Sequence, residues 1–114
     1  MKADKFVQSV FTTVVEGGVA SYRQVLANPG EVTDPYWKRL LALYRSLSPA
    51  RRKVLLEIMR QVEIDTVSEI FGILDGTSAL NGRVESFELL HKSGTKRVRL
   101  NGDLQDRLLV RAEG

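Results

Sequence analysis

Apolar residues recur at helical spacing along most of the chain. Over residues 3–16 they come in adjacent pairs four residues apart, a pattern that the alternation of a β-strand does not produce. This pattern predicts an amphipathic helix. Gly17-Gly18 predicts its end, because glycine adopts the left-handed conformation that follows many helices at little cost. A short second helix is predicted over about 19–27, before the turn sequence Asn28-Pro29-Gly30.

Two further helices have clear start signals. Asp34-Pro35 and Ser48-Pro49 each place a capping side chain before a proline at the first helical position, where the missing N–H costs nothing. The helix after Asp34 has a broad apolar band, which predicts burial on more than one side. From Pro49 the helical pattern persists to about Asp75, and Gly76 is the predicted stop.

The length of the fourth helix is itself informative. A straight helix over 49–75 is about 40 Å long, whereas a compact chain of 114 residues is roughly 34 Å across. Either the helix breaks near Glu63–Asp65, where the apolar spacing skips, or its overhang packs on a second copy of the chain. The second alternative predicts a homodimer.

The pattern changes after Asn81-Gly82. Apolar and polar residues alternate over 84–91 and over 96–100, which predicts two short strands around the turn Lys92-Ser93-Gly94-Thr95. Asp103 is then expected to cap a last helix. We predict an α+β fold, mostly α, in a single domain over residues 1–114. It has about four N-terminal helices, the fourth long or kinked, followed by a β-hairpin and a C-terminal helix.

Composition excludes several kinds of chemistry. The chain has no cysteine and one histidine, His91, so it has no thiolate metal site, no disulfide, no cysteine nucleophile and no multi-histidine metal site. Its glycines match no phosphate-binding loop. No base and orienting group accompany a serine, and His91 is interpreted as a partly exposed histidine at a strand end. We therefore expect no catalytic residues, no metal site and no cofactor.

The net charge of +3 is mild, but its distribution is uneven. Residues 91–99 carry four bases and no acid, namely Lys92, Lys96, Arg97 and Arg99. A basic ribbon of this kind is a candidate binding surface for a phosphate backbone. It equally protects a strand edge from pairing with other chains. Edge protection is favoured, because the hairpin lacks outward aromatic side chains for base stacking.

The long helix has an acidic surface. Residues 54–80 carry five acids against the single base Arg60, and Asp65 and Glu69 lie four apart on one helix face. These two are candidate binding residues, as a divalent-metal site or as a solvated face that meets a basic neighbour. Carboxylates alone make weak metal sites, which favours the solvated face. Arg51-Arg52-Lys53 opens this helix against its dipole and is expected to pair with its acids or to serve a partner.

Two segments carry a resemblance. Residues 65–76, DTVSEIFGILDG, and 100–106, LNGDLQD, are similar to stretches in a group of small bacterial cytoplasmic proteins of unknown function. The resemblance implies a bacterial source and a shared fold, and it assigns no functional residue. The polar side chains of the second segment, Asn101 and Gln105 among them, are expected to hydrogen-bond the neighbouring loop at 75–82.

Three classes of function remain at this point. The first is a non-enzymatic protein-interaction module of the bacterial cytoplasm, of adaptor or immunity type, working as a homodimer or on another protein. No apolar run is long enough to span a membrane, and the N-terminal stretch is too polar for a signal peptide. The second is an RNA- or DNA-binding protein that uses the basic hairpin. The third is a small enzyme that uses Asp65, Glu69 or Asp75 with a divalent ion.

Overall fold

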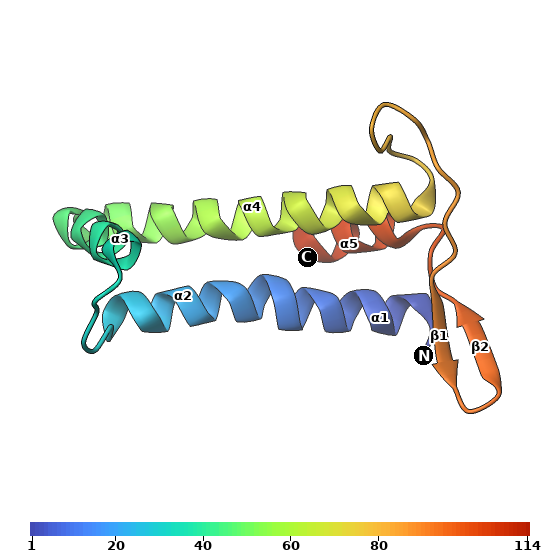
Figure 1. Ribbon diagram of the computed structural model, residues 1–114, viewed down its shortest axis with the longest axis horizontal. Helices are drawn as coiled ribbons and strands as arrows, with labels where there is room; N and C mark the ends of the chain where they lie inside the picture. Colours follow the sequence, from blue (N-terminus) through green and yellow to red (C-terminus); the bar gives the residue numbers. More distant parts are fainter.

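The computed structural model describes residues 1–114 and confirms the mostly helical α+β class. Its elements are α1 (Ala3–Val10), the π-helical segment η1 (Phe11–Glu16), α2 (Gly17–Ala27), α3 (Pro35–Ser46), α4 (Pro49–Asp75), β1 (Leu90–Ser93), β2 (Lys96–Arg99) and α5 (Leu104–Glu113). Two long rods lie antiparallel, one made of α1, η1 and α2 and the other of α4 (Figure 1). Helix α3 lies across one end, the hairpin lies at the other, and α5 runs along the C-terminal half of α4. None of the helices combines the length and the apolar character that a membrane crossing requires.

The prediction that Gly17-Gly18 ends the first helix is wrong. Gly17 has helical φ and ψ angles of −63° and −38°, and the helical backbone continues through it into α2. The buried residues Val7, Phe11, Val15 and Val19 follow one another at four-residue steps. Four-residue steps drift off the face of a 3.6-residue helix, and the wider turn of η1 corrects this drift. Packing of one continuous apolar stripe therefore overrides the glycine signal.

The two proline-marked helix starts are confirmed. Asp34 Oδ1 accepts hydrogen bonds from the backbone N–H of Tyr36 at 2.8 Å and of Trp37 at 3.3 Å. Ser48 Oγ accepts one from Arg51 N–H at 3.3 Å. Helix α4 is one unbroken helix that ends at Gly76, whose φ of +79° is left-handed. A break near Glu63–Asp65 is thereby excluded.

The core divides into two clusters along the rods. The larger cluster joins α1, η1, α4 and α5 near the hairpin end through Val7, Phe11, Val15, Ile64, Phe71, Leu104 and Leu108. The smaller cluster joins Leu26, Leu41 and Leu56 at the α3 end. Leu41 is the only buried residue of α3, so the expected burial of that helix on more than one side is wrong for the single chain.

The first predicted strand is too long. Only Leu90–Ser93 pairs with Lys96–Arg99, and residues 84–89 form no strand. The reason is the buried side chain of Asn101, which takes the place of a neighbouring strand. Its Nδ2 donates to the carbonyls of Phe87 at 2.7 Å and Leu74 at 2.6 Å, and its Oδ1 accepts from Leu89 N–H at 2.8 Å. The expected bonds from Asn101 to the loop at 75–82 are not formed, because its partners are Leu74, Phe87 and Leu89. Gln105 does contact that loop, through Asp75 and Thr77.

The cap of α5 comes from another helix. Asp103 makes no capping hydrogen bond, contrary to the prediction, and instead binds Arg107 Nε at 2.9 Å. Asp75, at the end of α4, accepts from Gly102 N–H at 2.7 Å and from Gln105 N–H at 2.9 Å. The Gln105 side chain in turn donates to Ser68 O at 3.0 Å. These bonds hold α5 against the C-terminal half of α4.

Candidate functional site

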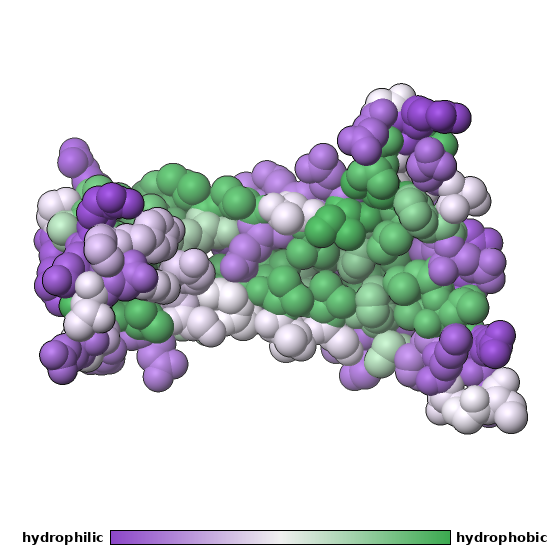
Figure 2. Space-filling model, in the orientation of Figure 1, coloured by the Kyte–Doolittle hydropathy of each residue, from purple (hydrophilic) through white to green (hydrophobic).

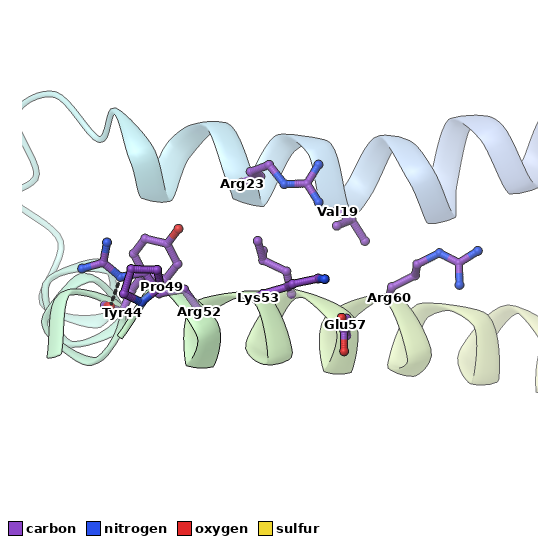
Figure 3. Close-up of a pocket in the computed structure, with 9 residues that line it drawn as sticks. Val19, Arg23, Tyr44, Pro49, Arg52, Lys53, Glu57 and Arg60 are labelled. Atoms are coloured by element: carbon purple, nitrogen blue, oxygen red, sulfur yellow. Dashed lines mark hydrogen bonds between the residues drawn. The ribbon is translucent and has the colours of Figure 1, made fainter. Parts of the chain in front are cut away.

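The main candidate site is a groove between α2 and α4 that holds a cluster of cations. The groove has a volume of about 500 Å³. Figure 3 shows that Arg23 comes from α2, whereas Lys53 and Arg60 come from α4. Its lining residues are Val19, Arg23, Tyr44, Pro49, Arg52, Lys53, Leu56, Glu57 and Arg60. Four cations and one carboxylate, Glu57, thus line the groove together with the buried apolar side chains of Val19 and Leu56.

Two of the four cations are held in place by the fold. Arg52 donates to the backbone carbonyls of Tyr44 at 2.9 Å and Arg45 at 3.2 Å, and its guanidinium lies 4.8 Å from the centre of the Tyr44 ring. The guanidinium of Arg60 lies 5.6 Å from the centre of the Phe11 ring. Neither set of contacts includes a carboxylate, so each arginine has no counter-ion.

No carboxylate neutralises this cluster. Both ion pairs of the structure involve Arg107, with Asp4 at 3.6 Å and with Asp103 at 2.9 Å. The expectation that Arg51-Arg52-Lys53 pairs with the acids of its own helix is therefore wrong. Arg52 and Lys53 face the groove instead. The arrangement suits an anionic ligand that brings its own carboxylates or phosphates.

Sequence reasoning had found only part of this groove. It singled out the basic start of α4 and noted Arg60 as the lone base of the acidic stretch. It missed Arg23 and Tyr44, because only the antiparallel packing of the rods and the crossing of α3 bring them to the same place. A usable signal existed in the spacing of Lys53, Leu56 and Arg60, which sets two bases and an apolar residue on one side of α4.

The candidate residues of the hairpin divide between its two faces. The register pairs Leu90 with Arg99 and Lys92 with Arg97, so Lys92, Arg97 and Arg99 share one face. Lys96 pairs with Ser93 and lies on the other. The Nε of Arg99 donates to Asn101 Oδ1 at 3.3 Å, which ties this base to the hairpin's own corner. His91 is half-buried, as expected, and its Nδ1 lies 3.4 Å from the N-terminal nitrogen.

The acidic candidates are not brought together. Asp65 and Glu69 are exposed on α4, and Asp65 accepts a hydrogen bond from Gln61 Nε2 at 2.9 Å. Asp75 is engaged as the cap of α5. No group of three or more His, Cys, Asp or Glu side chains is placed to hold a metal ion. The structure thus gathers no set of ligands around these carboxylates.

One further carboxylate lies between the rods. Glu63 packs against Gly18, where any β-carbon would overlap its carboxylate. Its Oε2 is shielded from water and has no hydrogen-bond partner. Burial raises the pKa of Glu63, because desolvation disfavours the charged form. Gly18 therefore serves the packing of α2 on α4, which is a second reason for a glycine inside a continuous helix.

Replacing Glu63 by glutamine is expected to raise the urea midpoint of unfolding at pH 7. The raised pKa means that stability is greatest where Glu63 is protonated and falls as the pH rises through the folded-state pKa. Glutamine mimics the protonated form at every pH. The gain should therefore disappear below about pH 4, where the wild-type carboxyl is protonated in both states. Urea titrations at pH 7 and pH 4 test this expectation.

The matched control is Glu31→Gln, in the exposed connection between α2 and α3. It should leave the midpoint unchanged at both pH values. An equal gain from both variants at pH 7 would trace the effect to net charge and not to the buried oxygen.

Comparison with protein-family models, with curated proteins and with solved structures finds no match. The resemblance of residues 65–76 and 100–106 to a bacterial group stays a prediction, and the function has to be argued from the geometry.

Proposed function

We propose that this protein is a non-enzymatic protein-interaction module of the bacterial cytoplasm, and that it binds an acidic segment of a partner protein in the groove between α2 and α4. The observation that carries the proposal is the set of four cations, Arg23, Arg52, Lys53 and Arg60, around an apolar floor with no carboxylate paired to any of them. A groove with charged walls and an apolar floor matches an amphipathic helix with acidic flanks.

The position of the groove supports a helical occupant. Ile64, Ser68 and Phe71 are the residues of α4 that meet α5. Eleven residues, or three turns, before them on the same face stand Lys53, Glu57 and Arg60, which line the groove. The groove residues of α4 therefore lie on the same side of the helix as those that meet α5, which runs along the C-terminal half of α4 (Figure 1). A partner helix there would complete the packing that α5 begins.

The experiment is affinity capture with the tagged full-length protein from lysate of the source organism, with and without nuclease. Arg23→Glu/Lys53→Glu reverses the two groove cations that make no hydrogen bond, ion pair or cation–π contact in the structure. A stoichiometric partner that the wild type still captures after nuclease treatment should be captured at least tenfold less by this variant, because like charges then meet across the interface. The purified pair should also dissociate more readily as salt rises.

The matched control is Lys92→Glu/Arg97→Glu, which makes the same charge change on the hairpin and should keep the partner. Capture that is equally strong with the groove variant would refute the groove as the binding surface. Circular dichroism of both variants checks that the helices are intact.

Nucleic-acid binding is the second candidate function, and the common face of Lys92, Arg97 and Arg99 supports it. It predicts that captured proteins disappear with nuclease and with the hairpin variant but not with the groove variant. Binding to duplex DNA should then weaken with a log–log salt slope of roughly −0.9 per phosphate contact. Absence of binding at low salt would exclude it.

A further inference from the structure

The chain exposes more surface than a compact protein of its mass. Its accessible surface is 8044 Å², whereas a compact monomer of 12.8 kDa exposes about 6,300 Å². Its radius of gyration is 17.7 Å, against about 13 Å for a compact chain of this length. The excess of roughly 1,700 Å² is about twice the 800 Å² that each partner contributes to a standard interface. The single chain therefore has surface available for a stable dimer.

Part of this surface is an apolar stripe on α4. Val54, Ile58 and Val62 follow one another at four-residue steps and are 51%, 55% and 57% exposed. Ile58, at the centre of the stripe, lies about 120–140° around α4 from the buried residues Ile64 and Phe71, so the stripe faces away from the core. Figure 2 shows hydrophobic surface along the N-terminal half of α4. A helix that is apolar on opposite sides needs cover on both, and α1, α2 and α5 cover only one.

We propose that a second copy of this chain covers the stripe, with the two α4 helices packed antiparallel about a two-fold axis midway between Ile58 and Val62. The charges on the same face of α4 favour a second copy of the chain as the partner. Arg51 lies seven residues before Ile58, and Glu69 lies seven residues after Val62. The two-fold therefore sets Ile58 against the partner's Val62 and Arg51 against the partner's Glu69, and each pairing occurs twice.

The antiparallel orientation follows from these charges. A parallel pair would set Arg51 against Arg51 and Glu69 against Glu69, which is repulsive at both ends. The antiparallel pair places opposite charges at both ends of the apolar stripe. It also accounts for two features that are unfavourable within one chain: a base at the start of a helix and the like-charged pair Asp65 and Glu69 at i, i+4. Asp65 lies one turn before Glu69 and adds a second carboxylate near the partner's Arg51.

Analytical ultracentrifugation of the full-length protein tests the interface. The wild type is expected to be a dimer at micromolar concentration. Ile58→Glu is expected to raise the dimer dissociation constant at least 100-fold, because it places a charge against the partner's Val62 on each side of the two-fold. The matched control is Val110→Glu on α5, a residue 71% exposed that lies outside the stripe. It should leave the dimer intact. Because Ile58 is exposed in the single chain, helicity by circular dichroism should not change.

The absence of cysteine allows a direct test of orientation. In the antiparallel dimer Arg51 and the partner's Arg51 are about 27 Å apart along the helix, since 18 residues separate positions 51 and 69. Arg51→Cys alone and Glu69→Cys alone should therefore not cross-link with a short thiol-specific reagent. An equimolar, re-equilibrated mixture of the two should give a covalent dimer.

Three results would overturn the proposal: a monomer at 100 micromolar, a dimer unaffected by Ile58→Glu, or a cross-linked dimer from either single cysteine variant alone. The groove lies on the other side of α4, so the dimer and the proposed function fail independently. Arg23→Glu/Lys53→Glu should abolish partner capture without changing the dimer, and Ile58→Glu should abolish the dimer.

Discussion

Replacing Leu108 by alanine is expected to lower the free energy of unfolding by about 3 kcal/mol. Leu108 is fully buried in the larger cluster, where α5 meets α1 and α4. Truncation removes its buried methyl groups and leaves a cavity that three packed helices cannot collapse into without moving α5. Urea denaturation followed by circular dichroism measures the change. Both proteins should be compared at one concentration, because the stability of a dimer depends on it.

The neighbouring residue supplies the control for this effect. Leu109 is 41% exposed on the same helix, so Leu109→Ala changes the helix sequence identically but opens no cavity. This substitution should lower the free energy of unfolding by less than about 1 kcal/mol. Equal losses from the two variants would show that α5 contributes through its helical propensity and not through its packing.

Replacing Asn101 by alanine is also expected to lower the free energy of unfolding by about 3 kcal/mol. The side chain of Asn101 is buried and joins the end of α4, through Leu74 O, to the backbone of Phe87 and Leu89. Its loss leaves one N–H and two carbonyl groups without their partners in a shielded corner, and each unpaired group carries a desolvation penalty. The hairpin should lose protection from amide hydrogen exchange before the rods do.

Asn28→Ala is the comparison for this substitution. Asn28 is exposed and its side chain makes no hydrogen bond, so its loss should change stability by less than about 0.5 kcal/mol. Hydrogen exchange of the hairpin amides should match the wild type in this variant. Uniform loss of protection across all helices in Asn101→Ala would contradict a role confined to the hairpin corner.

Local signals were sufficient wherever a helix boundary depends on groups close in sequence. Asp34 and Ser48 cap their helices as predicted, and Gly76 ends α4 in the left-handed conformation, because each acts on backbone within three or four residues of itself. The spacing of apolar residues likewise predicted the long helix and its excess over a compact domain. The mostly helical class, the hairpin and the C-terminal helix follow from these patterns alone.

Three wrong predictions, the helix end at Gly17-Gly18, the strand over 84–89 and the cap by Asp103, share one cause. In each, packing or a hydrogen bond from a distant part of the chain overrides a local signal. Gly17-Gly18 is a typical helix stop, but the residues from Val7 to Val19 form one buried apolar stripe only if the helix continues through both glycines. Residues 84–89 alternate like a strand, but the side chain of Asn101 bonds the backbone of Phe87 and Leu89 where a neighbouring strand would pair.

The cap of α5 and the groove depended on tertiary structure in the same way. Asp103 has the correct position in sequence to cap α5, yet Asp75 arrives from the end of α4 with both carboxylate oxygens aimed at the free N–H groups. The groove cations are separated by up to 37 positions, from Arg23 to Arg60, and only the antiparallel packing of the rods gathers them. Local chemistry sets where helices begin and end, whereas burial and hydrogen-bond satisfaction are properties of the folded whole and decide which side chains meet.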